Sequence, residues 1–76
     1  MIPYRIGEMV VCSPKGEEYY LKETPSGPTN YELPFRKDEI GIVLACVCAS
    51  SVVWKLEILT SSGVRGWIPS VYVERA

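Results

Sequence analysis

The side chains most able to do chemistry are three thiols, Cys12, Cys46 and Cys48, in a chain of 76 residues without histidine. Cys46 and Cys48 lie two apart in an expected strand, where their side chains share a face but diverge along it, so a disulfide framework is not expected. A four-ligand zinc site would need carboxylates to complete it. We therefore expect the three cysteines to behave as small apolar residues in a reducing compartment. We expect no bound metal and no cofactor.

The chain also lacks the groups that enzymes combine for catalysis. A thiol nucleophile needs a base, and no histidine is present to serve as one. There is no glycine-rich phosphate-binding motif, and the nine Asp and Glu residues are scattered over expected turns. The sequence therefore predicts a protein that is not an enzyme and has no small-molecule substrate.

Length and charge limit the kinds of partner. A chain of 76 residues forms one domain, residues 1–76, because it cannot divide its apolar surface between two cores. The net charge of −1, with both signs interspersed, gives no basic field for nucleic acid or for an anionic membrane surface. The uncharged run 40–54 is too short to span a bilayer, and the amino terminus does not resemble a signal peptide. We expect a cytoplasmic protein.

Six prolines interrupt the chain so often that no segment keeps a helical period, and the pattern predicts short strands between turns. The expected runs are residues 8–12, 19–22, 31–35, 40–47, 52–59 and 64–68, with a last short strand from Val73. Residues 13–14, 36–39, 49–51 and 60–63 are expected turns, Gly63 is free to take a positive φ, and residues 70–72 suit a single tight turn.

Alternation within these runs predicts one buried face. Trp54, Leu56 and Ile58 share a parity, so we expect them to face the core, and we assign Ile68 and Val73 to the core as well. Runs 19–22 and 31–35 face each other as one long hairpin. Five strands, this hairpin and a terminal turn bury a single apolar face best as a small closed barrel, so we expect an all-β, five-stranded barrel with one 3-10 turn near the C-terminus.

Three motifs resemble those of the Src-homology-3 (SH3) family. Residues 32–40 (ELPFRKDEI) are similar to its E-L-S-F-K-K-G-D-I segment, and residues 66–73 (GWIPSVYV) to its G-Y/L-I-P-S-N-Y-V ending. Between them, residues 53–57 (VWKLE) stand where such domains have W-W-K-G-E. The resemblance covers a little over half the chain and implies an SH3-like barrel in which residues 24–30 belong to an extended loop.

The family resemblance also implies a function, which is protein–protein interaction through a groove that binds a proline-rich segment of a partner. Polyproline II helix is already ordered, so docking it costs little conformational entropy. The resemblance implies that Glu32 pairs with an Arg or Lys of the ligand. It also implies that Trp67 and Tyr72 are aromatic residues of the groove and that Pro69 forms one of its walls. Tyr31, on the long loop, is a further candidate for the peptide-binding surface.

The sequence departs from the family pattern at the groove. Val53 replaces the first tryptophan, Val71 replaces the asparagine of P-S-N-Y, and neither tyrosine of the family's A-L-Y-D-Y strand is present near residues 10–14. Tyr19, Tyr20 and Tyr31 of the long loop are candidates to rebuild the surface or to pack on their own hairpin. Two alternatives stay open: a structural or assembly barrel that self-associates or docks on a folded partner through Val53 and Val71, and a nucleic-acid-binding barrel suggested by residues 5–11.

Overall fold

The computed structural model describes residues 4–12, 18–49 and 53–76. In these residues the chain forms seven strands and one 3-10 turn, which confirms the all-β class and the expected turn. The elements are β1 (Met9–Cys12), β2 (Tyr19–Lys22), β3 (Thr29–Phe35), β4 (Gly41–Cys48), β5 (Trp54–Thr60), β6 (Arg65–Pro69), η1 (Ser70–Tyr72) and β7 (Val73–Arg75). The described part of the chain contains no helix that is long and apolar enough to cross a membrane.

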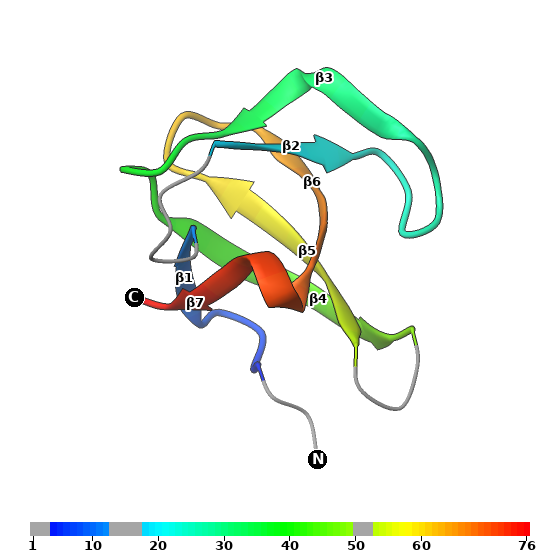
Figure 1. The fold of residues 1–76 in the computed structure, drawn as a ribbon. Coiled ribbons are helices and arrows are strands. Elements are labelled where there is room, and N and C mark those ends of the chain that lie inside the picture. The colour runs from blue at the N-terminus through cyan, green and yellow to red at the C-terminus, as the bar shows by residue number, and fades with distance from the viewer. Residues whose placement is uncertain (1–3, 13–17, 50–52) are drawn as a thin grey trace.

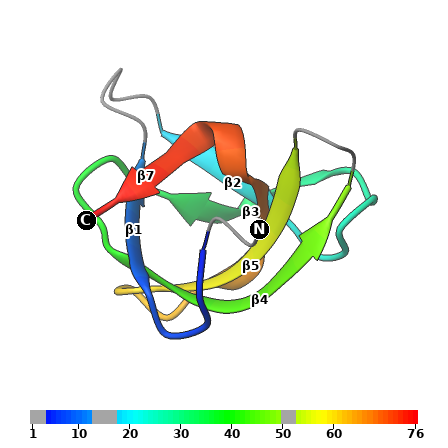
Figure 2. The same cartoon turned by 90° about the horizontal axis from the view of Figure 1, so that it is seen from below.

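The strands form one curled antiparallel sheet in the order β3-β2-β6-β5-β4-β1-β7 (Figure 1). The expected count of five strands is wrong, because both arms of the 19–35 hairpin are members of the sheet. β2 pairs with β3 and also with β6, through Lys22 and Trp67. The expected closure is also wrong for the described residues, since β3 and β7 remain as edges and the sheet is a half-barrel. Figure 2 shows β1, β4 and β5 curving around one side of the molecule.

The concave side of this sheet holds one core. Leu56, Ile58, Ile68 and Val73 are buried in it, as alternation predicts for those strands. The prediction for Trp54 is wrong: its side chain is half-buried, because it opens β5 opposite Cys48, where the β4–β5 hairpin extends past the core. The side chains that are most completely buried come from six different strands: Val10, Leu21, Phe35, Val43, Leu56, Ile58 and Ile68.

The turns follow the local chemistry of their residues. Gly63 has φ +90°, in the left-handed region that glycine adopts without strain, and its N–H closes the β5–β6 turn on the carbonyl of Thr60 at 2.9 Å. The turn after β3 is closed by the Glu39 N–H on the Arg36 carbonyl at 3.0 Å. The expected turn at residues 13–14, residues 50–51 of the expected turn 49–51, and the start of the fifth expected run at residue 52 lie outside the described residues.

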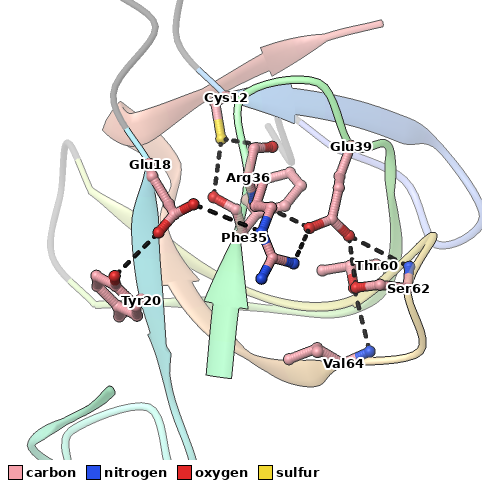
Figure 3. Close-up of polar contacts among 9 residues, drawn as sticks. All are labelled: Cys12, Glu18, Tyr20, Phe35, Arg36, Glu39, Thr60, Ser62 and Val64. Atoms are coloured by element: carbon pink, nitrogen blue, oxygen red, sulfur yellow. Dashed lines mark hydrogen bonds and ion pairs between the residues drawn. The ribbon is translucent and has the colours of Figure 1, made fainter. Parts of the chain in front are cut away.

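Polar contacts tie the β3–β4 turn to the β5–β6 turn (Figure 3). The Glu39 carboxylate accepts hydrogen bonds from the Ser62 hydroxyl at 2.7 Å, from the Ser62 N–H and from the Arg36 N–H. The Thr60 hydroxyl in turn accepts from the Val64 N–H at 3.1 Å. Burial raises the pKa of Glu39, but these hydrogen bonds to the charged form outweigh it and hold the pKa below its ordinary value.

Truncation of a core side chain tests the assigned face. Leu56→Ala should lower the free energy of unfolding by about 2–5 kcal/mol, because Leu56 is fully buried and its loss leaves a cavity. Leu59→Ala is the matched control on the opposite face of the same strand, where the side chain is partly exposed. Urea denaturation should show a much smaller loss for Leu59→Ala, and equal losses would contradict the assignment.

Glu39 should make the free energy of unfolding depend on pH in the acid range. Because its pKa is lowered by folding, its stabilisation is present above the ordinary value of 4.5 and is lost as the pH falls through the lower folded pKa. Glu39→Gln should cost about 1–3 kcal/mol at neutral pH and flatten the pH dependence of unfolding below pH 4.5. Part of the slope should persist, since hydrogen bonds from the Arg5 N–H and from Arg75 also lower the pKa of Glu8.

Asp38→Asn is the control for this experiment, because Asp38 is an exposed carboxylate in the same turn. In thermal unfolding at pH 7 it should cost far less stability than Glu39→Gln, because the hydrogen bonds that Glu39 accepts remain in place. A pH profile of Glu39→Gln that matches that of the unmodified chain would show that the Glu39 contacts do not stabilise the fold.

Candidate functional site

A hollow with a volume of about 380 Å³ lies where β2, β6 and η1 meet. β2 and β6 pair at Lys22 and Trp67, and the hollow opens beyond this pair toward Tyr19 and Pro69. We call it the aromatic hollow. Its lining residues are Glu18, Tyr19, Tyr20, Lys22, Thr29, Tyr31, Trp67, Ile68, Pro69 and Tyr72.

A glycine allows β2 to approach β6 so closely. A Cβ atom on Gly66 would lie 2.6 Å from the Cβ of Leu21 and 3.0 Å from the carbonyl oxygen of Lys22. Both distances are shorter than ordinary van der Waals contact, so any larger residue would push the hairpin away from the sheet. Gly66 therefore lets β2 lie close against β6 and lets Leu21 enter the core.

Two pairs of aromatic rings form its walls. The rings of Tyr19 and Tyr72 lie 4.8 Å apart between centroids and connect the hairpin to η1, and those of Tyr20 and Tyr31 lie 5.2 Å apart within the hairpin. Tilted pairs at these distances are favourable arrangements of ring quadrupoles. Tyr31 is nonetheless 76% exposed and Tyr72 41% exposed, so ring surface remains open to a ligand.

The structure brings together four of the five residues that the sequence proposes for peptide binding. Trp67, Pro69, Tyr72 and Tyr31 all line the aromatic hollow. Glu32 does not line it: the residue is exposed on β3, and its N–H donates to the side-chain oxygen of Asn30 at 2.9 Å.

Sequence reasoning left Tyr19, Tyr20, Lys22 and Glu18 out of the proposed site, although they line the same hollow. The two tyrosines were candidates to rebuild the surface or to pack on their own hairpin. Tyr20 packs on Tyr31 of the same hairpin, whereas Tyr19 packs on Tyr72 of η1. The predicted pairing of runs 19–22 and 31–35 was not enough to find them, because it is the pairing of β2 with β6 that places Tyr19 and Tyr20 beside Trp67 and Pro69.

Glu18 is the acidic group of the hollow. Its carboxylate accepts a hydrogen bond from the Tyr20 hydroxyl at 2.9 Å and lies 3.7 Å from the Nε of Arg36 (Figure 3). The hydrogen bond to Glu18 raises the pKa of Tyr20, which keeps the phenol protonated. The hydrogen-bonded side chains of Glu18 and Tyr20 thus add polar groups to the lining of the aromatic hollow.

A lysine from the sheet holds the tip of the hairpin. The Lys55 ammonium group on β5 donates a hydrogen bond to the carbonyl oxygen of Pro25, 30 residues away in sequence. Because Pro25 lies between β2 and β3, this contact fixes the far end of the hairpin that carries Tyr20 and Tyr31.

Two of the three thiols, those of Cys12 and Cys46, have pKa values raised above the ordinary value. Cys12 is buried and its thiol donates to the carbonyl oxygens of Phe35 at 3.4 Å and Arg36 at 3.5 Å (Figure 3). Burial, reinforced by nearby carboxylates, raises its pKa to about 11, so the nucleophilic thiolate is disfavoured. Burial also raises the pKa of Cys46. Among the described residues no three His, Cys, Asp or Glu side chains gather in a way that could hold a metal ion.

Comparisons of the chain with models of known protein families, with curated proteins and with solved structures find no match.

Gly66→Ala tests how the hollow is built. Its methyl group should separate β2 from β6, lower the free energy of unfolding by about 1–3 kcal/mol and shift the indole N–H resonance of Trp67. Gly63→Ala is the control. An alanine at this position is strained by the positive φ, but it has open space around it in the β5–β6 turn. It should destabilise the fold by about 1 kcal/mol and leave the Trp67 resonance in place. An unshifted resonance in Gly66→Ala would contradict this account.

Proposed function

We propose that this chain is a divergent member of the SH3 family and acts as a protein-interaction module that binds an extended, proline-rich segment of a partner in the aromatic hollow. The observation that carries the proposal is the convergence of Trp67, Pro69, Tyr72 and Tyr31 on one hollow.

The chemistry of the hollow suits such a ligand. A polyproline II segment has no internal hydrogen bonds, so its carbonyl groups are free to accept from Tyr hydroxyls and from an indole N–H, while its proline rings pack on aromatic faces. Because both partners are already ordered, little conformational entropy is lost on binding. A short segment in a shallow hollow gives weak, readily reversible binding.

The groove proposed here differs in composition from the pattern of the family. Val53 is half-buried and does not line the hollow, and Cys12, from the strand in which the family has tyrosines, is buried in the core. Tyr19 and Tyr20 on β2 supply aromatic surface instead. Glu18 and Glu32 lie on opposite arms of the same hairpin, and each is a candidate to pair with a Lys or Arg that flanks the prolines. An exposed ion pair of this kind contributes at most about 1 kcal/mol to binding.

Tyr72→Ala should weaken binding of a proline-rich peptide with little loss of stability, because Tyr72 contributes ring surface to the hollow and is partly exposed. Loss of one such contact should raise the dissociation constant about fivefold to thirtyfold, as expected for about 1–2 kcal/mol. Titration of ¹⁵N-labelled protein with a library of proline-rich peptides, followed by NMR, measures both the affinity and the residues that shift.

Val71→Ala is the matched control, since Val71 is 60% exposed in the same turn and does not line the hollow. It should bind the peptide as the unmodified chain does. Shifts confined to another face, or equal effects of the two substitutions, would remove the aromatic hollow as the binding site.

A further inference from the structure

One end of the aromatic hollow is rich in hydrogen-bond donors. Lys22 lies opposite Thr29 in the β2–β3 pairing and opposite Trp67 in the β2–β6 pairing, and all three side chains line the hollow. They bring an ammonium group, a hydroxyl group and an indole N–H, and the first and last of these can only donate. Within the described part of the chain, none of these three groups has a hydrogen-bond or ion-pair partner. This end of the hollow therefore offers donors to an acceptor that a ligand must supply.

Lys22 differs in this respect from most other cations of the described chain. The guanidinium groups of Arg36, Arg65 and Arg75 each lie 3.7 Å or less from a carboxylate oxygen, and the Lys55 ammonium group donates to a backbone carbonyl. The Lys22 residue is half-buried. A half-buried charge is screened less by water than a fully exposed one, so an anion placed beside it is bound more firmly than at an exposed lysine.

The charge of the hollow is reversed at its other end. Glu18 lies there, but its carboxylate already accepts from the Tyr20 hydroxyl and is 3.7 Å from the Nε of Arg36. Glu18 and Lys22 are four residues apart along extended chain, a separation of roughly 13 Å. A polyproline II segment covers that length in about four residues. The two ends of the hollow thus present opposite charges to the two ends of one short ligand segment.

We infer that the partner segment carries an Asp or Glu side chain that pairs with Lys22, about four residues from the basic residue that faces Glu18. The inference rests on the proposed function, because it names the class of proline-rich segment that the aromatic hollow selects. A carboxylate has two acceptor oxygens, so it can accept from the Lys22 ammonium group and from the Thr29 hydroxyl or the Trp67 indole N–H. The same pair fixes the direction in which the segment runs through the hollow.

The space beyond Lys22 favours a carboxylate on a side chain over one at a chain end. Thr29 also lines a second hollow, of about 280 Å³, at the tip of the hairpin. The other residues that line it are Glu23, Thr24, Gly27, Pro28 and Asn30. A ligand chain that passes Lys22 therefore has room to continue, and its acidic residue lies within the segment.

Titration of the ¹⁵N-labelled full chain with amidated proline-rich peptides tests the inference. Each peptide carries one Lys at a fixed position and one Glu at successive positions, with a matched Gln peptide for each. With Glu about four residues from the Lys, we expect binding about fivefold to tenfold tighter than with Gln, as for a charge-assisted hydrogen bond at a half-buried site. Added salt should reduce this preference, because it screens the ion pair.

Variants of the chain locate the pair. Lys22→Gln should remove the preference for the Glu peptide, and Lys22→Glu should reverse it in favour of a peptide with Lys at that position. Thr29→Val keeps the shape of the side chain but removes its hydroxyl, and should reduce the preference about twofold to threefold. Lys37→Gln is the matched control, because Lys37 is exposed in the β3–β4 turn and does not line the hollow. It makes the same change in net charge and should keep the preference, and urea denaturation checks that each variant is folded.

The outcomes separate this inference from the proposed function. Equal binding of the Glu and Gln peptides, with NMR shifts in the aromatic hollow, would overturn the inference and leave the proposed function in place. Absence of shifts with every proline-rich peptide would overturn both. A preference that survives Lys22→Gln would overturn the inference, because the acidic group would then pair elsewhere. So would a preference that appears only when the amide at the peptide's end is replaced by a free carboxylate.

Discussion

The close approach of β2 to β6 is the contact on which the rest of the structure depends. With hydrogen in place of a side chain at Gly66, Leu21 enters the core and the 19–35 hairpin becomes part of the sheet. The same approach sets the distance between the hairpin tyrosines and η1, and so the width of the aromatic hollow. Core packing and the candidate binding surface therefore have a common origin, and a change that moves the hairpin alters both.

Several contacts between distant parts of the chain keep the hairpin in this position. Lys55 holds its tip, the Glu18–Arg36 pair lies at its base, and Tyr19 stacks on Tyr72 of η1. Each is individually modest, because exposed ion pairs and ring contacts are each worth about 1 kcal/mol or less. Together they orient the aromatic side chains before any ligand arrives, which lowers the entropy that binding must overcome.

The sequence predicts the strands well because their signals are local. Alternation places Leu56 and Ile58 on the buried face, and glycine and proline mark the turns. It fails where the answer depends on packing between segments. The number of strands was wrong because no local pattern says that β2 pairs with β6, and Trp54 was wrong because parity does not show where a hairpin passes beyond the core. Four proposed site residues came together because their motifs lie on neighbouring elements, whereas Tyr19 and Tyr20 required knowledge of the pairing.

The outer edge of the sheet, β3, has a chemical feature that affects how a partner can bind. The Glu32 N–H is already bound to the Asn30 side chain, and Pro34 has no N–H to offer. A foreign strand laid along this edge would find donors missing at two positions of a seven-residue strand. Adding a strand along β3 is therefore unfavourable, so this edge of the sheet resists edge-to-edge pairing with another chain.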